Sequence, residues 1–458
     1  MALGRNDFER MGRGEHVELP EGLFGPLTEE ERDGPERPDL RRAVEWFKGY
    51  VGADWEKRRY AAFVRLYAAA VGWMDPSGKG QFFAENDTFG WYLFLADAFL
   101  DHPWNYEPMY GSRVIPVFEA IGRNLDLLKG VGNIDERLAR LVGSERSQPN
   151  GGIFELLVAS AYLRAGGTVA FRPETRGKGK SYDLDVEIDG LKLAVECKRM
   201  ETTDYGEKER MQMRHLWSGG SDLAKSMDRS TFANVTFGIP VFDVPEGYLA
   251  GKVDAWLRSG KPSLLWNDEI SHGVVGEPDL ARLNAVLETD DVLTAGSKVL
   301  SLITGSYRRH ENYIQGLRTA GGMSPRHMGA CNLAIVLRWK TVAPAAVDAK
   351  AKDVFRKLIE ANDQLPSDRP GIIHVGFEAV EGDEAEQARY AKILANTATF
   401  DPKGKPLLYV YNHYLIPESP PDEAWAFEER VQWHRITGVV PRPLKKPYLV
   451  LPDDHEEL

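Results

Sequence analysis

The sequence predicts an α/β protein with a mixed sheet flanked by helices, preceded by an all-α N-terminal domain. Three observations lead to this prediction: helical periodicity over residues 39–147, alternating strand-like and helical segments over 148–416, and a sharp hairpin signal inside the second region. The chain has 458 residues, 43% hydrophobic and 28% charged, which is normal for a globular protein. At roughly 150 residues per domain, this length suggests about three domains.

Composition and charge exclude several classes of protein. The net charge is −12, from 57 Lys and Arg against 69 Asp and Glu, so any phosphate-binding surface must be local. Two cysteines, Cys197 and Cys331, cannot form a disulfide framework or a four-cysteine zinc site. The longest apolar stretch, 60–74, carries Arg65 and is shorter than the about 20 residues of a membrane span. With no apolar signal core at the N-terminus, we expect a cytoplasmic protein without a membrane partner.

The N-terminal third reads as an irregular arm followed by helices. Residues 1–38 are charged and rich in Gly and Pro, which indicates the arm. Residues 39–147 are expected to form a helical domain that carries no recognisable chemistry and offers a surface for a protein partner. The apolar residues of its first helix recur on one face, at Ala43, Trp46, Phe47 and Tyr50.

The region 148–416 should form the α/β domain. A helix at 153–165 is closed by Gly166 and Gly167. The stretch 241–330 shows no clear strand content and is expected to be an insertion, and 417–458, Pro-rich with an acidic end, is expected to be a tail. Strands are expected at 168–172, 183–188, 191–198, 235–239, 332–339, 371–378 and 407–416.

One hairpin carries most of the functional signal. Asp189-Gly190 is a strong two-residue type I′ turn. If Ile188 then faces Leu191, Asp183 faces Glu196. Side chains alternate across a strand, so one face is apolar, with Leu184, Val186, Ile188, Leu191, Leu193, Val195 and Cys197. The opposite face carries Asp183, Asp185, Glu187, Lys192, Ala194, Glu196 and Lys198.

Opposed carboxylates need a compensating charge. The Cβ atoms of directly facing residues lie about 4.5–5.5 Å apart, where Asp183 and Glu196 repel, and a divalent cation or Lys198 would offset this. Glu155 stands in a helix that is apolar nearly all round, which indicates burial and the need for a partner. Two plainer interpretations stay open: a solvated charged strand face, and a Glu155 that stabilises the dipole in the first helical turn.

These residues resemble the PD-(D/E)XK nuclease superfamily, over about 50 of the 458 residues. The matching positions are Glu155, Asp183, Glu196 and Lys198; Tyr182 stands where the family motif has a proline. The resemblance implies a restriction-endonuclease-like fold and hydrolysis of DNA with Mg²⁺ or Mn²⁺. It implies that Asp183, Glu196 and the backbone carbonyl of Cys197 hold the metal, with Glu155 as an accessory ligand, and that Lys198 orients the attacking water.

The expected partner is DNA, in bacterial defence or DNA processing. Basic residues near the hairpin are the expected phosphate contacts: Arg172, Arg176, Lys178, Lys180 and Arg199. The alternative is a non-catalytic module on the same fold that binds nucleic acid or protein in an assembly. The sequence does not separate DNA from RNA or endonuclease from exonuclease action, and leaves the oligomeric state open.

Overall fold

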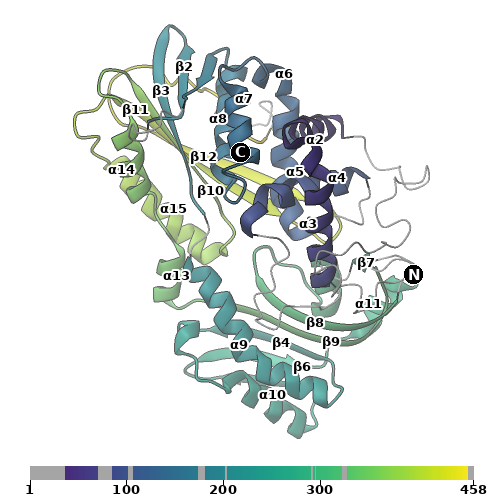
Figure 1. Ribbon diagram of the computed structural model, residues 1–458. Helices are drawn as coiled ribbons and strands as arrows, with labels where there is room; N and C mark the ends of the chain where they lie inside the picture. The colour runs from purple at the N-terminus through teal and green to yellow at the C-terminus, as the bar shows by residue number, and fades with distance from the viewer. Residues whose placement is uncertain are drawn as a thin grey trace.

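The architecture is taken from a computed structural model of the chain (Figure 1). The expected arm at 1–38 lies almost entirely outside the described residues. The structure describes residues 37–70, 85–101, 107–173, 181–201, 204–289, 292–293, 296–321 and 327–451.

The N-terminal region is helical, as predicted. In α2 (Pro38–Val51) the predicted apolar face is buried at Ala43 and Phe47, because that face packs on α5. Pro116 lies inside α5 without ending it. The helices are α2, α3 (Trp55–Ala70), α4 (Thr88–Asp101), α5 (Pro108–Arg123), α6 (Leu125–Leu128) and α7 (Ile134–Val142).

Six strands of the described residues form the first sheet, in the order β1-β2-β3-β10-β11-β12. The hairpin β2–β3 is antiparallel, β3, β10 and β11 run parallel, and β12 returns antiparallel. The α/β class with a mixed sheet is thus confirmed. The strands are β1 (Thr168–Phe171), β2 (Leu184–Ile188), β3 (Leu191–Arg199), β10 (Gly371–Glu378), β11 (Leu407–Glu418) and β12 (Ala426–Arg435).

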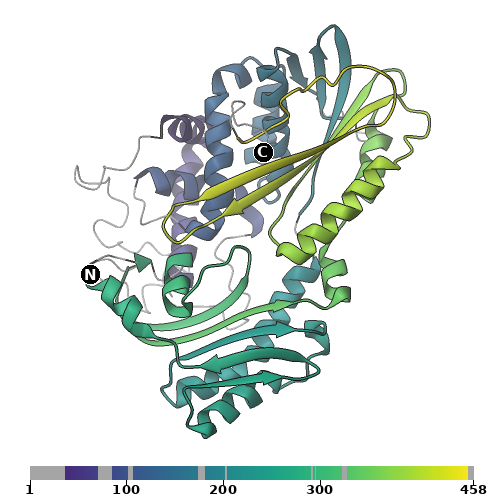
Figure 2. The ribbon, with the colours of Figure 1, turned by 180° about the vertical axis from the view of Figure 1, so that it is seen from behind.

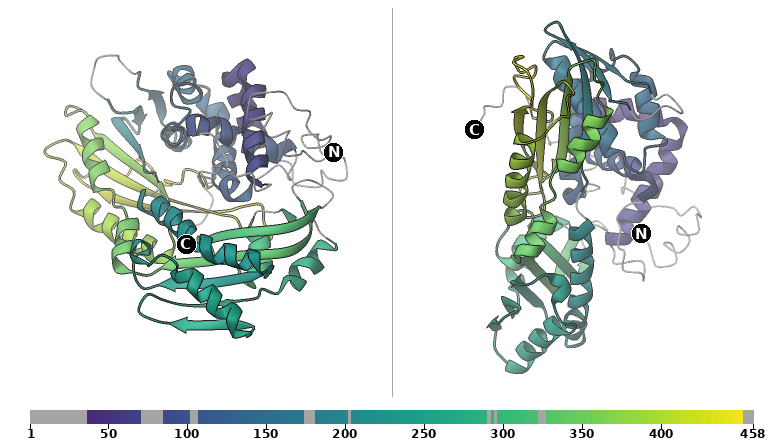
Figure 3. Two further views of the ribbon diagram at one scale, coloured as in Figure 1. Left: turned by 60° about the horizontal axis from the view of Figure 1, so that its bottom comes forward. Right: turned by 90° about the vertical axis from the view of Figure 1, so that its left-hand side faces the viewer.

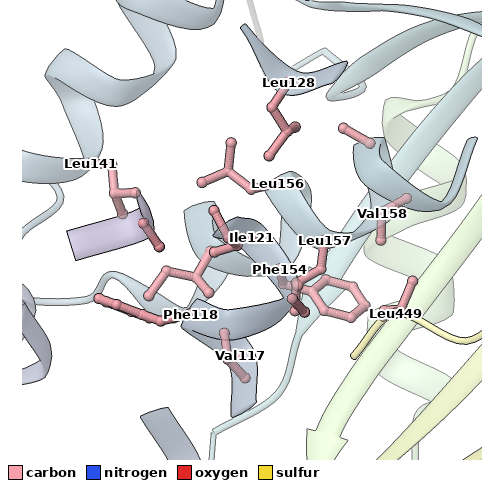
Figure 4. Close-up of a cluster of buried hydrophobic side chains, with 14 of the residues drawn as sticks. Val117, Phe118, Ile121, Leu128, Leu141, Phe154, Leu156, Leu157, Val158 and Leu449 are labelled. Carbon is pink, nitrogen blue, oxygen red and sulfur yellow. The ribbon is translucent and has the colours of Figure 1, made fainter. Parts of the chain in front are cut away.

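Helices cover both faces of this sheet. One face packs against α8 (Asn150–Arg164) and the N-terminal helices, so these share one hydrophobic core (Figure 4). The residues drawn there include Phe118 and Ile121 of α5, Phe154 and Leu157 of α8, and Leu449. The other face is covered by α14 (Phe355–Gln364) and α15 (Asp383–Ala398).

The stretch 241–330 differs from the expectation, because it contains strands. They join the segments expected at 235–239 and 332–339 in a second sheet, ordered β5-β6-β4-β9-β7, with β8 paired to β9. These strands are short or polar, so the apolar pattern missed them. The strands of the second sheet are β4 (Thr231–Phe237) and β9 (His327–Thr341), which contain the expected segments, and the missed strands β5 (Ser263–Asn267), β6 (Ser271–Gly276), β7 (Val292–Leu293) and β8 (Asn312–Gly321).

The second sheet and its helices form a unit between β3 and β10 in the chain. It lies below the first sheet in Figure 1 and in the right-hand view of Figure 3. Its two hydrophobic clusters are separate from those of the first sheet. Its helices are α9 (Asp204–Ser226), α10 (Tyr248–Ser259), α11 (Leu280–Leu287) and α12 (Ser297–Thr304), and α13 (Pro344–Lys350) leads back to the first sheet.

The C-terminal segment 417–458 is not the tail that the sequence indicates, because its described part is integrated in the fold. It supplies β12, the edge strand seen beside β11 in Figure 2. Buried Glu429 on β12 accepts the backbone N–H groups of Leu449, Val450 and Leu451 at 2.8, 2.9 and 3.2 Å. The charged residues of this edge strand hid it from the apolar pattern.

Candidate active site

The hairpin has the predicted turn and register. Asp189 and Gly190 have φ values of 52° and 76°, as a type I′ turn requires. Ile188 pairs with Leu191, and the ladder continues to Leu184 opposite Val195. The predicted apolar face is buried except for the partly exposed Leu191 at the turn.

Asp183 differs in detail from the predicted pairing, because it lies just beyond the ladder. Its backbone N–H donates to Val195 O at 3.1 Å. Its Oδ2 accepts the backbone N–H of Cys197 at 2.7 Å. The carboxyl group is therefore fixed against the strand that carries Glu196.

Glu196, which is buried, and Lys198, which is partly buried, form an ion pair on one face of β3. Glu196 has no exposed side-chain surface, and its Oε1 accepts a hydrogen bond from Lys198 Nζ. Burial raises the pKa of Glu196 to about 7, although Lys198 acts against the shift. Burial alone would lower the pKa of Lys198, but Glu196 raises it overall, so the ammonium group stays charged.

The three predicted acids are electrostatically coupled. Burial, followed by the charge of Glu196, raises the pKa of Asp183 to about 8. Burial, followed by the charge of Asp183, raises the pKa of Glu155 to about 8. The raised pKa values show that Arg137 and Lys198, although they pair with Glu155 and Glu196, do not fully offset the repulsion and loss of hydration of three closely spaced, largely desolvated carboxyl groups.

Glu155 is held by an arginine that sequence reasoning missed. Arg137 donates from Nε to Glu155 Oε2 at 2.6 Å and from Nη2 to Oε1 at 3.2 Å. Gly152 makes room for this contact, because a Cβ there would lie 2.2 Å from Arg137 Nη2. Since α8 begins at Asn150, Glu155 is beyond the first turn, which removes the helix-dipole interpretation.

Gln364, at the end of α14, is a further site residue that the sequence did not reveal. In the amide orientation that satisfies its neighbours, its nitrogen donates to Glu196 Oε1 at 3.2 Å and to Ser181 O at 3.3 Å. Its oxygen then accepts from Lys198 Nζ at 2.8 Å. The intervening second sheet separates Gln364 from the hairpin in sequence, so no local spacing could have identified it.

The predicted phosphate contacts are only partly brought to the site. Arg172 is exposed, pairs with Asp185 at 3.3 Å and lies over the ring of Tyr182. Arg199 is nearly buried and pairs with Glu378 at 3.0 Å; by strand alternation it faces away from Lys198. The remaining predicted contacts lie outside the described residues: Arg176, Lys178 and Lys180.

Two observations bear on whether the side chains of this site could bind a metal ion. Among the described residues, no group of three or more His, Cys, Asp and Glu side chains forms a metal site. Glu196 Oε2, however, is buried without a hydrogen-bond partner, and such an atom needs a donor or a cation. The backbone carbonyl of Cys197, next to Glu196, is the further oxygen that the resemblance assigns.

No described helix combines the length and apolar character needed to cross a membrane. Comparison of the chain with protein-family models, with curated proteins and with solved structures finds no match.

Proposed function

We propose that the chain is a divalent-metal-dependent nuclease that hydrolyses phosphodiester bonds of DNA, with its active site at Asp183, Glu196 and Lys198. The observation that carries the proposal is the buried, unpartnered Glu196 Oε2 beside a second carboxyl group of raised pKa. A hard cation would satisfy both groups at once.

The order of elements supports the restriction-endonuclease-like fold that the resemblance implies. An acidic helix, α8, precedes the antiparallel strands β1, β2 and β3, and β10 then adds parallel to β3. The second sheet would be an insertion between β3 and β10. Asp183, Glu196 and Lys198 all lie toward the end of the hairpin remote from its turn, which supports a shared site.

Asp183 and Glu196, with the backbone carbonyl of Cys197, would hold Mg²⁺ or Mn²⁺. When bound, such an ion lowers the pKa of a water molecule and neutralises phosphate charge. Repulsion between the carboxyl groups, which adds to burial in raising their pKa values, would become attraction to the ion.

The chain's own residues supply the rest of the chemistry. Lys198 keeps its proton and places a positive charge where the attacking water and the phosphate meet, which stabilises developing negative charge. Gln364 holds the Lys198 ammonium group at a fixed position through a 2.8 Å contact. Arg137 anchors Glu155, which orients the site as an accessory carboxylate.

The test is cleavage of a supercoiled plasmid by the purified chain with Mg²⁺ or Mn²⁺. We expect cleavage that EDTA abolishes and that Lys198→Ala lowers by about 10²–10³-fold, the usual cost of losing a transition-state contact. Lys192→Ala is a matched control, because Lys192 lies on the same strand but is exposed. Equal cleavage by Lys198→Ala and the wild type would refute the proposal.

A non-catalytic binding module is the second candidate, and one observation favours it. Lys198 and Glu155 already have partners within the chain, Glu196 and Arg137. In such a module these ion pairs would be purely structural. It predicts DNA or protein binding that is independent of divalent cations and no cleavage by the wild type under any metal condition.

A further inference from the structure

The outer edge of the second sheet is an unprotected strand. Strand β5 pairs with β6 on one side, and no other strand of the described residues pairs with it. This edge lies at the bottom of the molecule in Figure 2, remote from the first sheet. Proteins usually protect such an edge with a charged residue, a proline or a bulge. The five residues of β5 include no charge and no proline, and their pairing with β6 runs without a bulge.

Backbone groups of three residues in β5 point to this free edge. At the two ends of the β5–β6 pair, Asp268 N donates to Ser271 O at 3.0 Å and Glu277 N donates to Pro262 O at 3.3 Å. Hydrogen-bonded and non-hydrogen-bonded pairs alternate in an antiparallel ladder. The even-numbered residues of β5 therefore bond to β6, and the odd-numbered residues turn their N–H and C=O groups outward. The outward residues are Ser263, Leu265 and Asn267.

These outward groups are complementary to those of a second, antiparallel copy of β5. If Leu265 faces Leu265 of the second copy, Ser263 faces Asn267 in both directions, and two hydrogen bonds form for each facing pair. Pro262 has no N–H group, but it stands at a position that bonds to β6, so the new pairing loses nothing there. Such a contact uses the same surface on both copies and closes as a twofold dimer.

Side chains on both faces of β5 would gain apolar contacts. Leu265 is 76% exposed in the middle of the strand and lies beside the partly exposed Val274 of β6. Pairing would bring the two copies of Leu265 together and continue this apolar row across four strands. On the face that packs against α10, Leu264 and Trp266 are only partly buried. Leu264 would face Trp266 of the second copy, and cross-strand pairs of this kind stabilise a sheet.

The charges that flank β5 are complementary in the same register. Lys261 and Glu269 each lie four residues from Leu265, and both are exposed. Lys261 of one copy would therefore lie beside the turn that carries Glu269 in the other, and the twofold axis makes this contact twice. Asp268, the neighbouring acid, is already paired with Lys252 at 2.7 Å. Opposite charges at the two ends favour the antiparallel pairing and fix its register.

We infer that the protein forms a twofold dimer in which β5 pairs antiparallel with β5 of a second copy, centred on Leu265. The two copies of the second sheet become one continuous sheet. A second copy fits this edge better than an unrelated strand, because the facing side chains and the flanking charges are complementary to themselves in a single register. The contact lies in the second sheet, so the inference does not depend on nuclease activity.

The test is sedimentation equilibrium of the whole chain at low ionic strength, up to a concentration of about 500 μM. We expect a monomer–dimer equilibrium with a Kd of roughly 1–100 μM, as for a small interface. Leu265→Lys should weaken the dimer at least about tenfold, because two lysines would then face each other. Val439→Lys is the matched control, because Val439 is 90% exposed and lies outside the second sheet. A chain that stays monomeric at the highest concentration, or a Leu265→Lys variant that dimerises like the wild type, would overturn the inference.

Charge reversal tests the register of the pairing. Lys261→Glu and Glu269→Lys should each weaken the dimer by about 3- to 10-fold, because each change replaces two attractive surface contacts by two repulsive ones. The double variant that carries both changes should recover the affinity of the wild type. Both residues are exposed, so the variants should keep the fold. Single variants that dimerise like the wild type, or a double variant as weak as the single ones, would refute the proposed pairing.

Discussion

Replacing Asp183 by Asn should stabilise the metal-free protein at alkaline pH. The Asn side chain keeps an oxygen that can accept the Cys197 N–H group, which now donates to Asp183 Oδ2 at 2.7 Å. It removes the negative charge that adds to the effect of burial in raising the pKa of Glu155 to about 8. The change therefore separates the cost of the buried charge from the structural contact that the side chain makes.

The sign and size of the expected change in the free energy of unfolding follow from the pKa of Asp183, which is raised from 3.8 to about 8. A raised pKa in the folded state stabilises the protein below the unfolded value and loses that contribution as pH rises through the folded value. A shift of about 4 units, at about 1.4 kcal/mol per unit, sets an upper limit of about 6 kcal/mol. Since the repulsion with Glu155 and Glu196 is shared among the three groups, we expect about 2–3 kcal/mol for Asp183→Asn.

Urea unfolding in EDTA at pH 5 and pH 8.5 measures this difference. The variant should gain stability relative to the wild type between these two pH values. Glu187→Gln is the control, because Glu187 lies on the same strand face but is exposed, and its effect should not change with pH. If the gain in free energy of unfolding of Asp183→Asn over the wild type stays constant or shrinks as pH rises, a cluster of mutually repelling, largely desolvated carboxyl groups is refuted.

Three further changes test separate parts of the structure. Gln364→Leu should lower plasmid cleavage about tenfold at a temperature where the variant is fully folded, because Lys198 loses an acceptor; unchanged cleavage would contradict its positioning role. Glu429→Ala should lower the free energy of unfolding by about 2–3 kcal/mol and speed hydrogen exchange of the three C-terminal N–H groups that it accepts; slow exchange would contradict this. Gly376→Ala should cost about 1–3 kcal/mol in urea unfolding, since its Cβ would lie 2.3 Å from the ring of Phe154; wild-type stability would show that the ring moves freely.

Local patterns were enough to predict the hairpin. The Asp189-Gly190 turn fixes the register, and the register fixes which face carries Glu196 and Lys198. The burial of α8 was predicted in the same way, because its sequence is apolar on nearly every side of the helix. In the structure Phe154 and Leu157 both lie in the core. These features depend on residues close together in sequence, where periodicity and turn chemistry act directly.

Features that depend on distant segments could not be predicted. Arg137 and Gln364 reach the site from α7 and α14, and nothing in their local sequence indicates Glu155 or Lys198 as partners. The second sheet was missed because its edge strands, such as β8, mix polar and apolar residues without clear alternation. Arg199 follows Lys198 directly, yet its pairing with Glu378 depends on how β10 packs beside β3.

The most direct test of the proposed active site is calorimetric titration of Mn²⁺ into the wild type and Asp183→Asn at pH 7.5. We predict that the wild type binds Mn²⁺ and releases protons, because its carboxyl groups are partly protonated at that pH. Asp183→Asn should bind at least tenfold more weakly. A wild type that binds no Mn²⁺, or a variant that binds it equally well, would contradict a metal centre at Asp183 and Glu196.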